Sequence, residues 1–573
     1  MEYIMKRIIL LSIMIITGFT YSQSDYRFFI NKINMPINNK GVLGAVNVPP
    51  DGSLGRYNGI GFLFSGGFLI SGYNSDTLWA NGQATASLIE NHLPGPFGSN
   101  QFDPRHKVYV VKKTDPHFGP SWQEWVFAVE LGAKFYDGDG DGIYNPVDKN
   151  NNGVWDPDED RPDLIGDELA WSVYNDGVTP RLRFVDAEPV GIEIRQSVFG
   201  FRSGTSGVLE NMIFIRYEIL NTGALYPVLD SVYFAAWADA DLGDHVDDLV
   251  GADTLSNSGY LYNDSADAAF GNDPPAFFIN ILQGPVAYIP GETFIDVNAN
   301  GIYDEGIDTP LDTAYNNNGP LRGIETYPGA RNQKLTSFVH YQASDPTLGD
   351  PNTMQEARNY MLGQHRQGGY INPCTWILGQ VRGGVNCSEV NPLYWYSGDP
   401  ESNIGWINTR PTDQRMIVNT GHFTLLENEP VTIIIGYTIG HGTDEKNSVT
   451  KGKLFSQYAS EFYQSNFENT LVSVDDDKLM LPDDFKLFQN YPNPFNPSTK
   501  ISWQSPVGSW QTIKVFDVLG REVATLVDEY RDAGYYEVEF QSSIGSLQYA
   551  SGVYYYQLKA GSYIETKKMI LLR

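Results

Sequence analysis

Two stretches, IFIRYEIL at residues 213–220 and VTIIIGYTIG at residues 431–440, decide the fold of the central part of the chain. Both are rich in β-branched and aromatic residues and carry apolar side chains on both faces. Such runs are typical of strands in sandwiches with large buried faces. The same pattern predicts strands at Ile60–Leu69, Lys107–Lys112, Trp125–Leu131, Ile192–Phe201, Met212–Asn221, Ser231–Trp237, Leu335–Tyr341 and Val431–Ile439. We therefore expect a mainly β protein.

One helix is predicted in this region, at Lys453–Asn466. Its apolar residues recur at i, i+3 and i+4, which predicts that one face packs on the core. We expect this helix to close a β-rich body at residues 23–467, which the sequence leaves open as one or two sub-domains. The largely polar and acidic residues 468–480 are predicted to form a linker.

The tail at residues 481–573 has prolines, glycines and short apolar runs in a pattern that predicts a second, smaller β unit. Pro492, Pro494 and Pro497 exclude a helix and favour an extended segment. Short apolar runs follow, at Lys500–Gln504, Thr512–Val518, Glu522–Val527, Tyr535–Phe540, Gly552–Leu558 and Ile564–Leu571. Glycines between the runs favour an antiparallel sandwich. On composition alone, this would be an ordinary Ig-like adhesive domain.

Four landmarks occur in order in this tail: NYPNPFNP at Asn490–Pro497, DVLGRE at Asp517–Glu522, SGVYY at Ser551–Tyr555, and Lys567–Lys568. Together they resemble the type A C-terminal sorting domain of type IX secretion cargo, which Bacteroidota-type bacteria export. The resemblance implies a small Ig-like β-sandwich at residues 481–573 that the type IX secretion and sorting machinery binds. It also implies delivery to the outer cell surface or the medium.

Parts of the body, such as LYWYSGDPESNIGW at residues 393–406 and NDPPAFFINILQGP at residues 272–285, resemble an uncharacterised family of large secreted proteins. Those proteins usually end in the same sorting domain. The resemblance therefore supports export and implies no particular reaction.

The N-terminus agrees with export. Lys6 and Arg7 precede a mostly apolar run at Ile8–Phe19, and small residues follow for cleavage after Ser22. This pattern predicts a secretory signal peptide at residues 1–22. The run is shorter than the ~20 residues that a membrane-spanning helix needs, and no later stretch is apolar for that long. We expect no transmembrane span.

Length and charge narrow the function further. At 573 residues, the chain should hold two to four domains. Its formal net charge is −30, and such a chain repels nucleic acid and anionic membranes, because phosphate binding needs clustered Lys and Arg. The charge suits cation binding, or simply solubility outside the cell.

The chain has two cysteines, Cys374 and Cys387. In an exported protein, a close isolated pair favours a disulfide over a metal or catalytic site. Two free buried thiols are the alternative.

The strongest local chemistry lies in FYDGDGDGIYNPVDKNNNGVWDPDED, residues 135–160. Calcium loops of the EF type supply oxygens from positions 1, 3, 5, 7, 9 and 12 around a glycine at position 6. One such loop starts at Asp148, and its side-chain ligands would be Asp148, Asn150, Asn152, Asp156 and Glu159.

A preceding loop starts at Asp137, with Asp139 and Asp141 at positions 3 and 5 and Gly142 at position 6. Its twelfth residue is Asp148, so either one carboxylate serves two ions or only one site fills. Without flanking amphipathic helices, these loops resemble those of dockerin-like and thrombospondin-type repeats. An acidic turn without metal is the alternative, although residues 137–168 hold eleven acidic and two basic side chains, whose repulsion a cation would relieve.

A looser copy of the pattern, FIDVNANGIYDEGID, lies at residues 294–308. Its candidate calcium ligands are Asp296, Asn298, Asn300 and Asp304. Position 12 is Ile307, so Asp308 or Glu305 would have to take its place.

A third acidic group lacks the glycine spacing, and a solvated acidic loop explains it at least as well as an ion site. Its members are Asp239, Asp241, Asp244, Asp247, Asp248 and Asp253.

Recognisable catalytic motifs such as HExxH, GxSxG, GxxxxGK[ST] and GxGxxG do not occur in the sequence. The sequence therefore favours an exported protein with structural calcium that acts in binding, adhesion or envelope structure, with a glycan or other surface ligand as a candidate partner. The alternative is a secreted polysaccharide-acting hydrolase with its site on the body, because two carboxylates brought together by folding leave no local motif.

Overall fold

The computed structural model of the chain describes residues 24–83, 91–179, 187–202, 207–342, 345–468, 485–490, 493–505, 508–531, 534–541, 543–544, 547–561 and 563–572. The predicted signal peptide at residues 1–22 and all but the first residue of the predicted linker lie outside these ranges. Strands account for 44% of the structure and helices for 9%, which confirms the mainly β prediction. The chain divides between Val472 and Ser473 into two compact units.

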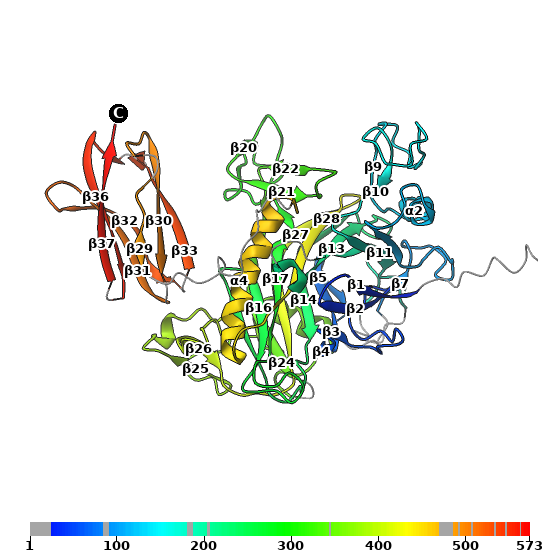
Figure 1. The fold of residues 1–573 in the computed structure, drawn as a ribbon, viewed down its shortest axis with the longest axis horizontal. Helices are drawn as coiled ribbons and strands as arrows, with labels where there is room; N and C mark the ends of the chain where they lie inside the picture. Colours follow the sequence, from blue (N-terminus) through cyan, green and yellow to red (C-terminus); the bar gives the residue numbers. More distant parts are fainter. Residues whose placement is uncertain are drawn as a thin grey trace, which may run out of the picture. The chain divides into compact units, whose positions relative to one another are not determined.

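The larger unit is built on two antiparallel sheets (Figure 1). The nine-stranded sheet has the order β15-β16-β17-β28-β13-β12-β11-β7, and β8 also pairs with β11. Its strands are β7 (Leu93–Pro94), β8 (Tyr109–Lys112), β11 (Glu168–Asn175), β12 (Ile192–Gly200), β13 (Met212–Asn221), β15 (Asp248–Asp253), β16 (Ser258–Asn263), β17 (Ala276–Gln283) and β28 (Val431–Gly440). The five-stranded sheet has the order β24-β27-β14-β5-β6. Its strands are β5 (Ser65–Asn74), β6 (Thr77–Gly82), β14 (Val228–Asp239), β24 (Leu335–Gln342) and β27 (Gln414–Leu426).

The two sheets face each other across an aromatic core. The ring of Phe68, on β5, lies 5.3 Å from that of Tyr217, on β13. On the opposite side of β13, the ring of Phe214 lies 6.1 Å from that of Phe462, on helix α4. Side chains of a strand alternate between the two faces of a sheet, so β13 is buried on both faces. This explains why IFIRYEIL shows no simple alternation of apolar and polar residues.

Helix α4 (Glu445–Gln464) covers the outer face of the nine-stranded sheet along β16, β17 and β28. The predicted helix is confirmed, but it begins eight residues earlier, where the side chain of Asp444 accepts the Lys446 and Asn447 amides as an N-cap. Gly452 lies inside this helix, where glycine is intrinsically unfavourable, because a larger residue would not fit against β17. A Cβ atom there would come within 2.1 Å of the ring of Phe278.

Two predicted strands need correction. Residues 125–131 belong mostly to helix α2 (Pro120–Glu130), which begins with Pro120 and buries Trp122, Trp125 and Ala128 at helical spacing. Residues 60–69 form two strands, because the extended strand is interrupted at Phe64, between β4 (Ile60–Leu63) and β5. A further helix, α3 (Met354–Met361), begins with a capping box of Thr353 and Glu356.

Short strands and turns complete this unit. They are β1 (Asp25–Phe29), β2 (Ile33–Asn38), β3 (Gly55–Tyr57), β9 (Phe135–Tyr136), β10 (Arg161–Pro162), β18 (Val286–Ala287), β19 (Phe294–Ile295), β20 (Thr309–Pro310), β21 (Thr313–Asn317), β22 (Ile324–Pro328), β23 (Arg331–Asn332), β25 (Gly379–Arg382) and β26 (Gly405–Asn408), with 3₁₀ turns η1 (Val208–Asn211) and η2 (Cys387–Glu389). A disulfide joins Cys374 to Cys387. The predicted pairing is therefore confirmed.

The smaller unit holds two main sheets, β29-β30-β33 and β32-β31-β36-β37. Their strands, with the separate pair β34-β35, are β29 (Lys486–Leu487), β30 (Ser498–Ser505), β31 (Ser509–Phe516), β32 (Glu522–Arg531), β33 (Gly534–Gln541), β34 (Ser543–Ile544), β35 (Leu547–Gln548), β36 (Gly552–Ala560) and β37 (Tyr563–Leu571). Trp503, Ile513, Tyr556 and Leu558 are among its fully buried core residues. This unit matches the small β-sandwich expected from the tail.

Candidate metal-binding loops and the sorting domain

Three acidic loops share one backbone design, and we name them loop A (residues 137–148), loop B (residues 148–159) and loop C (residues 296–308). In each loop, the aspartate at position 1 accepts the amide of the glycine at position 6. The oxygen–nitrogen distances are 2.9 Å for Asp137–Gly142, 2.7 Å for Asp148–Gly153 and 2.7 Å for Asp296–Gly301. The backbone at positions 4 and 6 has positive φ in all three, at Gly140, Gly142, Asn151, Gly153, Ala299 and Gly301. The three turns are therefore equivalent.

Loop B is closed by Glu159, as its sequence position predicts. Glu159 is buried, and its two oxygens accept the amides of Lys149 at 2.6 Å and Asp156 at 2.9 Å, which are positions 2 and 9 of the loop. Two side-chain amides converge on one oxygen of Asp156, from Asn150 at 2.7 Å and from Asn152 at 2.8 Å. All five predicted side chains of loop B thus surround one turn.

Loop A is closed by Asp160 rather than by Asp148. Asp160 is buried and accepts the amides of Gly138 at 3.0 Å and Asn145 at 2.8 Å, again positions 2 and 9. Asp148 instead binds amides of its own loop B. Counting twelve residues from Asp137 could not find Asp160, because loop B lies between them in the sequence.

Loop A brings several carboxylates together. One oxygen each of Asp137, Asp139 and Asp160 lies within 4.8 Å of the others, close enough to hold one metal ion. Asp141, the other predicted ligand, accepts the amide of Ile143 at 2.7 Å. The Lys149 ammonium lies 3.1 Å from Asp139, and its hydrogen bond lowers the pKa of that carboxyl group.

Loop C is closed by Asp308, one of the two substitutes that the sequence allowed. The oxygens of Asp308 accept the amides of Val297 at 2.9 Å and Asp304 at 2.8 Å, which repeats positions 2 and 9. Asn298 and Asn300 donate to Asp304 at 2.7 and 2.8 Å, as Asn150 and Asn152 do to Asp156 in loop B. Loops B and C are therefore close structural copies.

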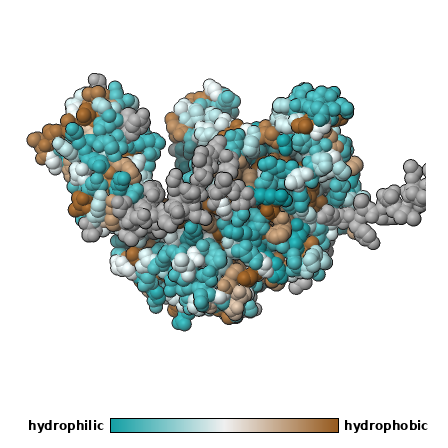
Figure 2. Space-filling view, in the orientation of Figure 1, coloured by the Kyte–Doolittle hydropathy of each residue, from teal (hydrophilic) through white to brown (hydrophobic). Residues whose placement is uncertain are grey.

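Each loop is fixed at its base. The short pair β9–β10 joins the ends of the segment that carries loops A and B, and β19–β20 does the same for loop C. The aromatic residue at position 8 is anchored by contacts in each loop. The Tyr144 hydroxyl donates to the Trp122 carbonyl at 3.0 Å, the Trp155 ring nitrogen to the Glu159 carbonyl at 2.8 Å, and the Tyr303 ring stacks 5.6 Å from that of Tyr288. The lobe at β9 and β10, at the upper right of Figure 1, is mainly hydrophilic in Figure 2.

The third acidic group is not a solvated loop throughout. Asp239, Asp248 and Asp253 are buried, at 5%, 0% and 6% exposure. One oxygen each of Asp239, Asp241 and Asp413 lies within 4.8 Å of the others. Asp413 stands far away in the sequence, so only the fold shows that it belongs here.

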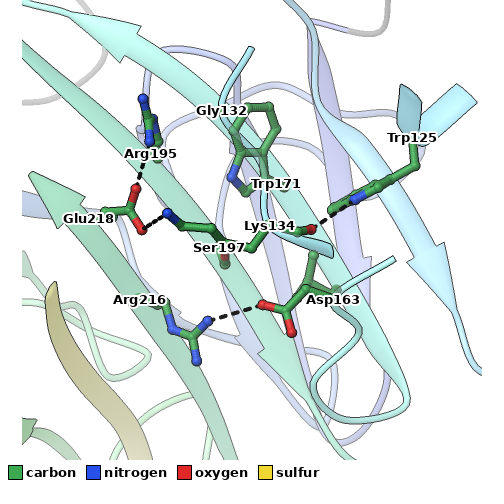
Figure 3. Close-up of a pocket in the computed structure, with 10 residues that line it drawn as sticks. Trp125, Gly132, Lys134, Asp163, Trp171, Arg195, Ser197, Arg216 and Glu218 are labelled. Carbon is green, nitrogen blue, oxygen red and sulfur yellow. Dashed lines mark hydrogen bonds and ion pairs between the residues drawn. The ribbon is translucent and has the colours of Figure 1, made fainter. Parts of the chain in front are cut away.

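A small polar pocket lies on the outer face of the nine-stranded sheet, and Trp125, Trp171 and several charged side chains line it (Figure 3). Its charged side chains are paired: Glu218 with Arg195 at 2.8 Å and Lys134 at 3.5 Å, and Asp163 with Arg216 at 3.5 Å and Arg322 at 3.0 Å. Its volume of about 20 Å³ suits one or two water molecules and is far below the 300 Å³ or more of ordinary ligand pockets. This pocket cannot hold a sugar ring.

In the smaller unit, hydrogen bonds of landmark residues hold the N-terminal segment against the strands. The Asn490 amide donates to the Tyr556 hydroxyl at 2.8 Å, and Asn493 accepts the amide of Ile570 at 2.9 Å. The DVLGRE segment forms a turn in which Asp517 accepts the Arg521 amide at 3.0 Å and pairs with its guanidinium at 2.7 Å. Asn490, Asn493 and Asp517, from two of the landmarks, therefore make structural contacts within this small sandwich.

Residues 489–572 match the family of secretion system C-terminal sorting domains. This unit is a C-terminal sorting domain. The chain is type IX secretion cargo, which is exported to the cell surface or secreted, and its sorting domain interacts with the type IX machinery. Among the described residues, no helix has both the length and the apolar character needed to cross a membrane.

Other comparisons add little. No curated protein matches the chain. One solved structure, a polysaccharide lyase, aligns with 66% of this chain at 8% identity and a TM-score of 0.18. The alignment spans only 34% of that protein. This likeness is too weak to carry a conclusion about activity.

Proposed function

We propose that the exported body is a calcium-stabilised protein that acts in binding, adhesion or envelope structure. The observation that supports this proposal best is the threefold repetition of one loop design. Loops A, B and C share the aspartate–glycine turn and a buried carboxylate that grips positions 2 and 9. Such repetition is unexpected if the acidic segments are only solvated turns.

The donor chemistry favours calcium among the common cations. Each loop offers carboxylate, carboxamide and backbone oxygens, which are the ligands of hard cations. Calcium takes six to eight oxygens in flexible geometry, whereas magnesium demands a near-ideal octahedron and keeps much of its water. In this proposal, the cations offset carboxylate repulsion and stiffen long loops on the outside of the cell. The body would then present a stable surface to a glycan or another surface ligand.

Thermal unfolding of the full mature chain, without its signal peptide, tests the calcium part. We expect millimolar calcium to raise the melting temperature and a chelator to remove the gain, because extracellular calcium modules bind at roughly 10⁻⁴ to 10⁻³ M. Asp137→Asn, Asp148→Asn and Asp296→Asn should each remove part of the gain, while the exposed control Asp76→Asn should keep it. A melting temperature that does not respond to calcium would refute the proposal.

A glycan panel separates binding from the alternative, a secreted polysaccharide-acting hydrolase. Retention of a glycan by the full mature chain without release of shorter sugars supports the binding role. Release of sugars by the purified chain would overturn it in favour of the hydrolase.

A further inference from the structure

Three carboxyl groups, those of Asp239, Asp241 and Asp413, meet at one end of the five-stranded sheet, and Asp248 of the neighbouring sheet lies near enough to interact with Asp241 and Asp413. We name these four residues the sheet-end cluster. Asp239 ends β14, and Asp241 follows it by two residues. Asp248 begins β15, and Asp413 directly precedes β27. Three separate segments of the chain therefore contribute to the cluster, and oxygens of Asp239, Asp241 and Asp413 lie within 4.8 Å of one another.

Asp248 sets this cluster apart from an ordinary acidic surface. It is fully buried, and among the described residues the Leu242 amide is the one donor that acts on its carboxyl group. Burial raises its pKa well above the usual value, and the nearby carboxyl groups of Asp241, Asp247 and Asp413 raise it further, while the Leu242 amide opposes the shift. A buried carboxylate with so little hydrogen bonding is costly, and a bound cation would stabilise it.

Arg415 organises the cluster without neutralising it. Its guanidinium lies 3.2 Å from each oxygen of Asp239 and 2.7 Å from Asp413. Two basic side chains, Arg415 and His245, thus stand against four carboxyl groups. Carboxylate ligands of metals are commonly held by such hydrogen bonds from a second group, which orient them toward the ion.

Asp239, Asp241 and Asp413 offer oxygens within 4.8 Å of one another, so their negative charges repel one another. A divalent cation bound among them would relieve this repulsion.

We propose that Asp239, Asp241 and Asp413, together with the buried Asp248, form a cation site separate from loops A, B and C. Its ligands are carboxylate oxygens only, so it should take a hard divalent cation such as calcium rather than zinc or copper, which prefer imidazole and thiolate. An ion there would tie the end of β14 to the starts of β15 and β27. The ion would therefore link the two sheets, because β15 is an edge strand of the nine-stranded sheet and β14 and β27 are central strands of the five-stranded sheet.

The test counts calcium ions on the full mature chain by equilibrium dialysis at pH 8. A loop-deficient parent carries Asp137→Asn, Asp148→Asn and Asp296→Asn, so that the result does not depend on whether the loops bind calcium. We expect this parent to retain one ion per chain. Adding Asp413→Asn or Asp241→Asn should weaken binding at least ~10-fold, whereas Asp76→Asn should leave it unchanged.

Asp248→Asn gives a second, independent reading. Asparagine has the size of a neutral aspartic acid, so it should bind calcium like the parent if Asp248 is only a protonated core residue. We expect it to weaken binding instead. The proposal is overturned if the loop-deficient parent binds no ion, or if Asp241→Asn, Asp413→Asn and Asp248→Asn all bind as the parent does. Circular dichroism shows which variants are folded. If the variant at the buried Asp248 does not fold, the test rests on Asp413→Asn, because Asp413 is partly exposed.

Discussion

Exchanging the two closing carboxylates one at a time should loosen loops A and B separately. Asp160→Asn keeps one acceptor oxygen but places an NH₂ group against the amide of Gly138 or Asn145, which the parent holds at 3.0 and 2.8 Å. A lost hydrogen bond to a charged group costs about 1.5–3 kcal/mol. This corresponds to a loop-opening constant that rises about 10- to 150-fold. Glu159→Gln should do the same to the amides of Lys149 and Asp156.

Hydrogen exchange read by mass spectrometry measures this opening directly in a calcium-free buffer. Asp160→Asn should speed exchange in residues 138–145 and Glu159→Gln in residues 149–156, while the exposed control Asp158→Asn should alter neither. Glu159→Gln also removes one negative charge and so relieves some repulsion, but the weakened hydrogen bonds to Lys149 and Asp156 should outweigh that gain in the calcium-free protein. Equal effects of both variants on both segments, or exchange no faster than in the control, would refute the separate closure of loops A and B.

Four further predictions follow from the fold. Deleting residues 481–573 should leave the protein in the periplasm with its signal peptide removed, and cell fractionation that finds it on the surface would contradict the sorting role. Non-reducing peptide mapping should recover Cys374 joined to Cys387, and replacing both by serine should cost at most about 3 kcal/mol in urea unfolding. Phe462→Ala should cost about 3–5 kcal/mol, because its buried ring packs 4.9 Å from that of Phe201, while Gln457→Ala on the exposed side of α4 should be near neutral. In chelator, the raised pKa of Asp239 makes a stability contribution that is present below about pH 4 and lost as pH rises through about 7, so Asp239→Asn should flatten the change in unfolding free energy between pH 5 and 8.

Local patterns predicted much of this structure. The strands at IFIRYEIL and VTIIIGYTIG could be predicted because their side chains must be buried on both faces, and the tail because its landmarks are themselves structural contacts. Helix α2 was missed because its dense aromatic residues also suit a strand, and only the spacing of Trp122, Trp125 and Ala128 distinguishes the two.

The acidic sites could be predicted only in part, because some of their residues come from distant segments of the chain. Loop B closes within its own twelve residues, so counting finds Glu159. Loop A is closed by Asp160, which follows loop B in the sequence. The sequence indicates this closing residue only by placing a second carboxylate directly after Glu159. Asp413 reaches Asp239 through the pairing of β14 with β27, which brings together residues far apart in the chain. No local pattern carries that information.

The adjacency of Glu159 and Asp160 gives the closures of loops A and B different entropy costs. Loop B closes between residues 10 apart, Lys149 and Glu159, whereas loop A closes between residues 22 apart, Gly138 and Asp160. Each doubling of a flexible segment adds about 0.6 kcal/mol to the entropy cost of joining its ends. Loop B therefore closes at the lower entropy cost, and Asp160, which closes loop A, directly follows Glu159, which closes loop B. The closure of loop B is nested within that of loop A, so loop B can close by itself, whereas the closing contact of loop A spans all of loop B.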